Sequence, residues 1–300
     1  MGLIILFKMA STAEVCESIL TQPPSSPHAI AYNYLVPNVR GLENLVSILQ
    51  KSEYPTPPTT PPPQDSSESA PVTSPSDPTP ASGASSSTQN TSEISLIAAA
   101  TEAFSRANTN CTIQESLDRS QPIIALAKQH NLRVRGYVSV ALGCPYEGPN
   151  VDPHKVASMT ASLLEMGCDE VSVADTTGMG TAPRTRELLR VLRDAGIREE
   201  DIALHFHDTY GQALVNTLVG LEAGVRIFDC SVGGLGGCPY SKGATGNVGT
   251  EDMIHMLHSL GVETGVSIEE MAKIGEWITA ELGKANESRA GKATMARLRG

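Results

Sequence analysis

The sequence lacks any run of basic residues. Its 22 Lys and Arg side chains are scattered among 33 Asp and Glu, which gives a net charge of −11 and a pI near 5.1. This balance argues against a surface that binds nucleic acid or anionic membranes. Paired cysteine spacing is also missing from the six cysteines. Neither a disulfide framework nor a zinc cluster is therefore expected, and a reducing compartment fits better.

Targeting signals are not readable either. The apolar run from Leu3 to Phe7 is broken by Lys8 and is too short to span a bilayer. The first residues form neither an Arg- and Ser-rich leader, nor a signal peptide with a clean cleavage site, nor a myristoylation motif. No Gly-x-Gly-x-x-Gly opens a helix after the first strand, so a dinucleotide fingerprint is excluded.

What the sequence does contain is a regular alternation of strand-like and helix-like segments, with enough apolar residues (40%) for a core. Strands are expected at 93–99, 133–141, 170–174, 202–207 and 226–232. Helices are expected at 114–130, 153–167, 183–195, 212–223 and 268–282, and a further helix with Thr250 as its N-cap is expected to carry Met253, Ile254, Leu257 and Leu260. Such repeated units indicate a parallel sheet covered by helices, either an open doubly wound sheet or a closed barrel. Polar residues follow four successive strands, which favours a (β/α)8 TIM barrel, because all its strand-to-helix loops open on one face.

The chain before residue 93 differs in composition. Residues 11–20 and 41–50 are helix-like and 31–36 strand-like, whereas 51–92 form a Pro/Ser/Thr tract without periodicity. Such a tract cannot bury enough apolar surface to offset the entropy of ordering it, so we interpret it as a disordered insertion. The predicted organisation is an N-terminal part of the barrel at 1–50, the insertion at 51–92, the main barrel at 93–285 and a tail at 286–300.

The most informative stretch is the predicted strand that carries His205 and His207. Side chains in a strand alternate between faces, so both imidazoles point the same way while Phe206 points the other. Two imidazoles at the carboxyl end of a strand can hold a divalent cation. The alternative is a pair of histidines that only form hydrogen bonds.

A glycine-rich loop follows the last predicted barrel strand. It runs through Gly233, Gly234, Gly236 and Gly237 to Cys238. One thiol on a mobile loop suits an acid/base group on a lid, although an incidental cysteine in a turn is the alternative. Farther along the same loop, Asn247 offers a hard amide oxygen. With two imidazoles and a carboxylate, that oxygen suits Mg²⁺ or Mn²⁺ better than zinc.

Two further residues are candidates for the same end of the barrel. Asp175 ends a predicted strand in Ala-Asp-Thr-Thr-Gly, where it orients substrate, joins the outer shell of a metal, or only caps the turn. Cys144 lies in Gly-Cys-Pro-Tyr, the same four residues that surround Cys238, and we interpret it as structural.

The motifs together resemble one family. The segments at 136–148, at 205–213 and at 231–240 closely resemble 3-hydroxy-3-methylglutaryl-CoA lyase. The likeness runs through about 93–285 and, more loosely, 9–50, where Tyr34-Leu35-Val36-Pro37-Asn38 fits the third barrel strand. The Gly-Gly-Cys-Pro-Tyr loop is specific to the family, whereas His-x-His-Asp is shared with Claisen-type synthases and carboxyltransferase barrels.

The resemblance implies a metal-dependent barrel that cleaves 3-hydroxy-3-methylglutaryl-CoA to acetyl-CoA and acetoacetate, in leucine catabolism and ketone-body formation. It implies that His205, His207 and Asn247 bind Mg²⁺ or Mn²⁺, that Cys238 moves protons, and that Asp175 lies on the substrate side. The expected partner is an acyl-CoA, with no nucleic acid or membrane, a homodimer as one allowed assembly, and a mitochondrial matrix location by resemblance alone.

One element of the family pattern is not found in these 300 residues. Members open with a strand ending in Arg-Asp-Gly, which supplies another metal ligand and an arginine, and Arg193-Asp194-Ala195 at a helix end does not match it. The first two strand–helix units are therefore expected to be missing, which leaves about six strands of eight. The favoured interpretation is a lyase chain incomplete at its N-terminus. Alternatives are an inactive barrel fragment that pairs with another chain and a Claisen-type acyl-CoA synthase.

Overall fold

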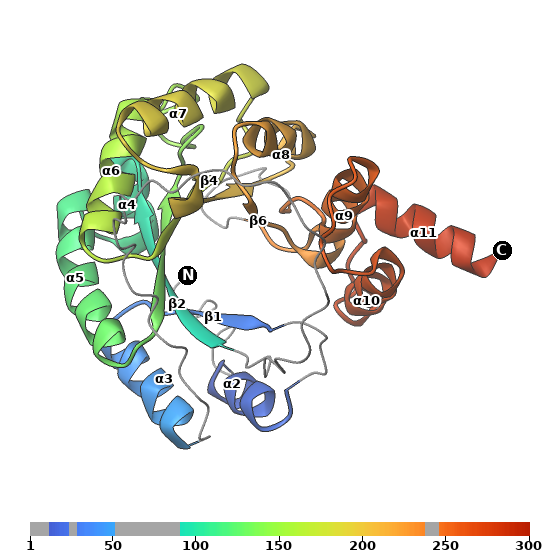
Figure 1. Ribbon diagram of the computed structural model, residues 1–300, viewed down its shortest axis with the longest axis horizontal. Coiled ribbons are helices and arrows are strands. Elements are labelled where there is room, and N and C mark those ends of the chain that lie inside the picture. Colours follow the sequence, from blue (N-terminus) through green and yellow to red (C-terminus); the bar gives the residue numbers. More distant parts are fainter. Residues whose placement is uncertain (1–11, 24–28, 52–90, 238–245) are drawn as a thin grey trace, which may run out of the picture.

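The computed structural model describes residues 12–23, 29–51, 91–237 and 246–300. Six strands form one sheet in chain order, and every neighbouring pair is parallel. They are β1 (Ala31–Leu35), β2 (Thr91–Ala99), β3 (Arg133–Ser139), β4 (Glu170–Asp175), β5 (Ile202–Phe206) and β6 (Ile227–Asp229). Within the described ranges the sheet curls without closing, because β1 and β6 do not pair (Figure 1). This confirms the predicted barrel class with six of its eight strands.

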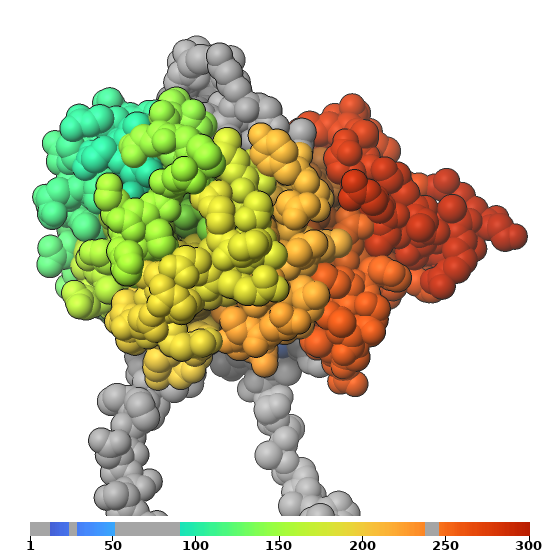
Figure 2. Space-filling view, turned by 90° about the horizontal axis from the view of Figure 1, so that it is seen from above, coloured from blue at the N-terminus to red at the C-terminus, as the bar shows by residue number. Residues whose placement is uncertain are grey.

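The helices cover the outer side of this curled sheet. They are α2 (Thr12–Thr21), α3 (Val39–Lys51), α4 (Glu102–Thr109), α5 (Ile113–Gln129), α6 (Pro153–Glu165), α7 (Ala182–Asp194), α8 (Ala213–Glu222), α9 (Thr250–Ser259), α10 (Ile268–Glu281) and α11 (Arg289–Arg299). Helices α3 and α5 to α8 follow one another around the ring, and α9 to α11 gather beyond β6 (Figure 1). From above, the colours run in chain order from one side to the other and end at α11 (Figure 2). Each helix therefore packs near its neighbours in sequence.

The hydrophobic core lies between the sheet and these helices. Alternate strand residues that face outward are almost fully buried, among them Val134, Val138, Leu204 and Phe206. Each such side chain contributes about 1.5–3 kcal/mol when it is removed from water. The inward positions of the same strands are largely polar, which is where the candidate site lies.

Several element boundaries differ from those expected. The strand predicted at 226–232 is only three residues long, because Ser231 leaves the sheet and its backbone NH donates to Val248 instead. Thr250 is the first residue of α9, and Gly249 takes the N-cap position that was predicted for Thr250. Helix α4, capped by Thr101, was not predicted. Helix α11 occupies most of the predicted tail.

The predicted insertion falls almost wholly outside the described residues. Strand β2 begins at Thr91, two residues before the expected boundary. The preceding helix α3 ends at Lys51. The described elements on either side of the tract are therefore a helix and the next strand of the sheet. Its predicted disorder stays a prediction.

Candidate functional site

The two imidazoles lie side by side at the carboxyl end of β5. The ring centroids of His205 and His207 are 5.3 Å apart. His205 belongs to the strand, whereas His207 follows it and forms a bridge with Asn247. His207 is buried, and the side chain of His205 is 23% exposed. The alternation read from the sequence therefore places both rings on one face.

Asn247 is brought to these rings by the returning segment after the glycine-rich loop. Its neighbour Val248 donates a backbone hydrogen bond to the carbonyl of Phe206, and Asp208 donates one to Gly246. Asn247 Nδ2 donates to the Leu235 carbonyl at 3.0 Å. The other side-chain atom, Oδ1, is buried and accepts no hydrogen bond among the described residues. A buried oxygen without a donor carries a desolvation cost that a cation could offset.

The loop backbone approaches Asn247 closely. Gly236 has a φ of 102°, and a Cβ built there would lie 2.6 Å from Asn247 Nδ2. Any other residue would be strained and would push the amide away. Glycine at this position therefore allows the loop to hold the amide group.

A carboxylate contacts His205 from the neighbouring strand. Asp229 is the register partner of His205, and the distance from His205 Nδ1 to Asp229 Oδ2 is 3.3 Å. The same carboxylate accepts hydrogen bonds from Ser172 Oγ and Arg135 Nη1, both at 2.9 Å. Burial raises the pKa of Asp229, but the hydrogen bond from His205 and the charge of Arg135 outweigh this effect and lower it overall.

Arg135 links two carboxylates across the interior. Its Nη2 forms an ion pair with Glu170 at 2.6 Å, in addition to the contact with Asp229. Burial disfavours its charge, but a hydrogen bond with Tyr137 and the two carboxylates raise the pKa of Arg135 overall. Burial and the nearby Asp229 charge raise the pKa of Tyr137 to about 12, so its hydroxyl stays protonated. The interior is thus a connected polar network.

Three residues of this network were not predicted from the sequence, namely Arg135, Glu170 and Asp229. Their signal is the alternation within each strand, since Arg135 and Tyr137 both face inward on β3. What the alternation does not give is the register between strands, and the register makes these groups neighbours.

Asp175 is not brought to the imidazoles. Its register partner is Phe206, so its side chain lies on the outer face, opposite His205. The carboxylate accepts a hydrogen bond from Gly180 N at 2.8 Å and one from Thr177 Oγ1 at 3.3 Å. Only 1% of it is exposed, and burial raises its pKa to about 6. This geometry matches the turn-capping alternative more closely than a substrate contact.

The two cysteines of the Gly-Cys-Pro-Tyr sequences differ. Cys144 is fully buried, with its sulfur 3.2 Å from Thr101 Oγ1, which agrees with a structural role. Cys238 lies outside the described residues. The start of its loop is fixed, because Gly233 N donates to the buried carboxylate of Glu251.

The donors present fit a hard divalent cation. His205, His207 and Asn247 supply nitrogen and oxygen, as expected from the sequence. Among the described residues, no group of three or more His, Cys, Asp and Glu could hold a metal ion. A cation here would therefore depend on the amide oxygen and on donors beyond the described residues.

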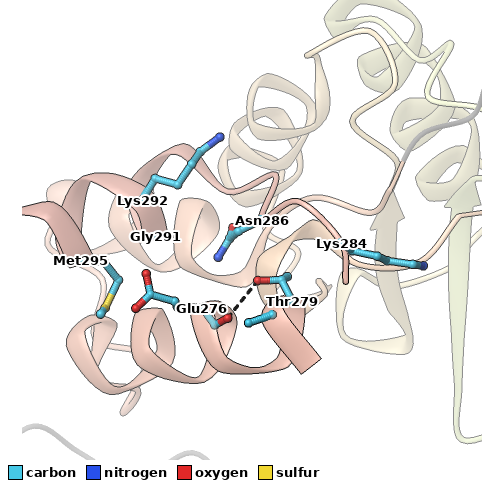
Figure 3. Close-up of a pocket in the computed structure, with 8 residues that line it drawn as sticks. Glu276, Thr279, Lys284, Asn286, Gly291, Lys292 and Met295 are labelled. Carbon is cyan, nitrogen blue, oxygen red and sulfur yellow. Dashed lines mark hydrogen bonds between the residues drawn. The ribbon is translucent and has the colours of Figure 1, made fainter. Parts of the chain in front are cut away.

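Two other observations concern regions away from this cluster. A pocket of about 250 Å³ lies between α10 and α11, lined by Glu276, Thr279, Ala280, Lys284, Asn286, Gly291, Lys292 and Met295 (Figure 3). It shares no residue with the histidine cluster. No helix in the described part of the chain is both long and apolar enough to cross a membrane.

The fold and the site define a class. A curled parallel sheet with imidazole and amide donors at its strand ends is an incomplete (β/α)8 barrel with its chemistry at the carboxyl end. The chain belongs to the HMGL-like family, which matches residues 81–278. The family resemblance expected from the motifs is thereby confirmed.

Relatives of high sequence identity are named hydroxymethylglutaryl-CoA lyases. A Pseudomonas aeruginosa protein named 3-hydroxy-3-isohexenylglutaryl-CoA/hydroxy-methylglutaryl-CoA lyase is 52% identical over 68% of this chain and 68% of its own length. The mitochondrial hydroxymethylglutaryl-CoA lyase of Rattus norvegicus is 47% identical over 67% of this chain, which spans only 62% of that protein. The crystal structure of hydroxymethylglutaryl-CoA lyase from Pseudomonas aeruginosa has a TM-score of 0.76 at 41% identity, over 96% of this chain and 80% of that one.

Proposed function

We propose that this chain carries the cleavage site of a lyase that converts 3-hydroxy-3-methylglutaryl-CoA into acetyl-CoA and acetoacetate. The observation that carries the proposal is the convergence of His205, His207 and the buried Asn247 Oδ1 at the carboxyl end of the sheet. Family membership supplies the substrate class. Because the Pseudomonas relative is also named for an isohexenyl substrate, a longer 3-substituent is tested beside the methyl compound.

His205, His207 and Asn247 are the residues that would hold Mg²⁺ or Mn²⁺. When bound, such a cation polarises a substrate hydroxyl and a carbonyl or carboxylate oxygen. Once a base takes the hydroxyl proton, the oxygen electrons form the ketone of acetoacetate and the carbon–carbon bond breaks. This releases acetoacetate and leaves an acetyl-CoA enolate that must be protonated. We assign that proton transfer to the Cys238 thiol, since a positioned thiol can act as a general acid.

Asp175 takes a positioning role in this proposal. Its carboxylate binds the backbone of Gly180, and its own carbonyl accepts a hydrogen bond from His207 N at 3.3 Å. The residue thus connects the loop after β4 to the backbone of His207. The enolate charge needs a cation, and the arginine that supplies it in the family's Arg-Asp-Gly motif has no counterpart in these 300 residues.

The test compares two proteins. One is the 300-residue chain, and the other is the same chain preceded by the family's Arg-Asp-Gly strand and its following unit. We expect little or no acetoacetate release from the first with Mg²⁺ or Mn²⁺, and clear release from the second. If the extended protein also fails to cleave either substrate, the proposal is wrong.

The two Gly-Cys-Pro-Tyr cysteines provide a matched control. In the extended protein, Cys238→Ala is expected to lower turnover by about 10²–10⁴-fold, the usual range for a lost acid/base group. Cys144→Ala keeps the proton-transfer group and is expected to change stability instead, because Cys144 is fully buried. Equal turnover losses in both variants would remove the assignment to Cys238.

A second candidate is a barrel that no longer catalyses and pairs its open edges with another chain. The six strands support it, because the edges of β1 and β6 have no partner within the described residues. Failure of the extended protein to bind Mn²⁺ would favour this candidate. A homodimer is one assembly that would cover the edges.

A mitochondrial location is part of the proposal and rests on the rat relative, which is named mitochondrial. The Pseudomonas relative is bacterial, so the family as a whole is not confined to that compartment. Imaging of the tagged protein in cells of its source would decide the location. A role in leucine breakdown and ketone-body formation depends on the same proposal.

A further inference from the structure

The carboxylate of Asp229 is the meeting point of three strands. His205 on β5 lies 3.3 Å from Oδ2, Ser172 on β4 donates to Oδ2 at 2.9 Å, and Arg135 on β3 donates to Oδ1 at 2.9 Å. Asp229 itself ends β6. Its side chain is 15% exposed, and those of Arg135 and His205 are 16% and 23% exposed. Side chains this buried lose little contact strength to solvent screening.

The contact between His205 and Asp229 implies a location for one proton. An ionised carboxylate only accepts hydrogen bonds, so the proton between His205 and Asp229 is on His205 Nδ1. The neutral ring then has its lone pair on Nε2, which is the form in which an imidazole binds a metal. Register supports this pairing, because His205 and Asp229 are opposite one another on adjacent strands.

We propose that Asp229 is the positioning residue that holds His205 with Nδ1 protonated and Nε2 free for a divalent cation. The inference rests on the proposed function in that it assigns His205 to a cation. Asp229 does not touch the substrate in this scheme. It acts through the ring that it orients.

Arg135 requires a hydrogen-bond acceptor, such as a carboxylate, at position 229. The guanidinium can only donate, and its other nitrogen is held by Glu170 at 2.6 Å, so it cannot turn away from Asp229 without losing an ion pair. Its charge is shared between two carboxylates. A cation bound to His205 would therefore interact with the Asp229 charge through the imidazole ring. The charge of Arg135 is already neutralised by two carboxylates and would repel this cation little.

These contacts give the variant Asp229→Asn a defined outcome. The amide oxygen must face Arg135, which always donates, so the amide NH₂ is turned toward Ser172 and His205 Nδ1. An NH₂ next to Nδ1 requires Nδ1 to accept, which moves the ring proton to Nε2. The nitrogen intended for the cation is then protonated, and the effect of a wrong tautomer on a histidine site is large.

The experiment uses the full 300-residue chain and does not need turnover. Nitrogen-15 NMR of the metal-free protein reports which imidazole nitrogen of His205 carries the proton, with His205→Gln to assign the signal. Electron paramagnetic resonance titration reports Mn²⁺ affinity. The matched control is Asp169→Asn, since Asp169 accepts from Val134 N and Lys128 Nζ just before the start of β4, away from His205.

We expect His205 to be protonated on Nδ1 in the unaltered chain and on Nε2 in Asp229→Asn. Mn²⁺ binding should weaken by about 10–100-fold in that variant and not in Asp169→Asn. A proton on Nε2 in the unaltered chain would overturn the proposal, and this measurement needs no variant to fold. Unchanged Mn²⁺ affinity in Asp229→Asn would also overturn it. If neither the 300-residue chain nor the extended protein binds Mn²⁺, the proposed cation site fails, and the tautomer alone decides the role of Asp229.

Discussion

The two faces of the six-stranded sheet carry opposite chemistry. The outer face packs apolar side chains such as Leu204 and Phe206 against the helices. The inner face carries Arg135, His205 and Asp229 in one hydrogen-bonded network. Residues 205 and 206 are adjacent in sequence, yet one belongs to the site and the other to the core. A single strand therefore provides stability on one side and chemistry on the other.

The largest effect is expected where the inner face meets the proposed cation. His205→Ala removes one of the three proposed ligands. We expect Mn²⁺ affinity to fall by more than about 100-fold, with any metal-dependent acetoacetate release of the extended protein lost as well. The measurement is the same Mn²⁺ titration. Retained binding with retained turnover would remove the metal hypothesis.

The neighbouring residue tests the opposite face. Phe206 is 1% exposed, and Phe206→Ala is expected to lower the free energy of unfolding by about 3–5 kcal/mol. His205→Ala should cost far less, because Asp229 keeps its contacts with Ser172 and Arg135. Urea denaturation followed by circular dichroism gives both values. Equal losses would contradict the separation of roles between the two faces.

Asp175 is a carboxylate on the outer face of the sheet, and its burial lowers the stability of the fold at neutral pH. Burial raises its folded-state pKa to about 6, compared with an ordinary value of 3.8. Between pH of about 4 and 6 the folded state therefore binds the proton more tightly than the unfolded state. Stability falls as pH rises through that window, by up to about 3 kcal/mol.

The variant Asp175→Asn should remove this dependence. Its amide oxygen can still accept from Gly180 N, so the turn is kept. Unfolding measured at pH 4, 5, 6 and 7 would give a flatter profile than that of the parent. An unchanged slope would mean that another group titrates in this range.

A smaller effect is expected at the edge of the inner face. Gly236→Ala places a Cβ 2.6 Å from Asn247 Nδ2 and requires a positive φ. We expect a stability loss of about 1–2 kcal/mol and weaker Mn²⁺ binding, because the amide that carries Oδ1 is displaced. Gly261→Ala is the control, since it also has a positive φ but has open space around the added Cβ. The difference between the two variants isolates the displacement of Asn247.

Much of the fold could be predicted from residue patterns. Residue patterns placed the starts of all six strands within two residues of those observed, and the two histidines at the end of β5 marked the site. Helix α11 was missed because its sequence is mostly basic and small. Its buried residues are Gly291 and Thr294, and the helix packs against α9 and α10.

The contacts between the site residues could not be predicted from the sequence. Periodicity gives the face of a side chain within its own strand, whereas the register between strands pairs Asp229 with His205 and Asp175 with Phe206. Reading 226–232 as one long strand also hid the fact that Asp229 lies at a strand end, where functional groups gather. Local pattern and long-range pairing are separate information, and the site depends on the second.

The smallest effect is expected for an arginine outside the sheet. Arg190 on α7 forms ion pairs with Glu187 and Asp194, but its side chain is 56% exposed. Arg190→Gln should change stability by less than about 0.5 kcal/mol, because solvent screens the pair and the free side chains gain entropy. Arg135→Gln leaves Glu170 and Asp229 without their partner in the interior, which should cost about 3–5 kcal/mol. Both variants replace arginine with glutamine. Urea denaturation of the two therefore measures how much burial increases the loss in free energy of unfolding. Similar losses would mean that the interior network is as hydrated as the surface.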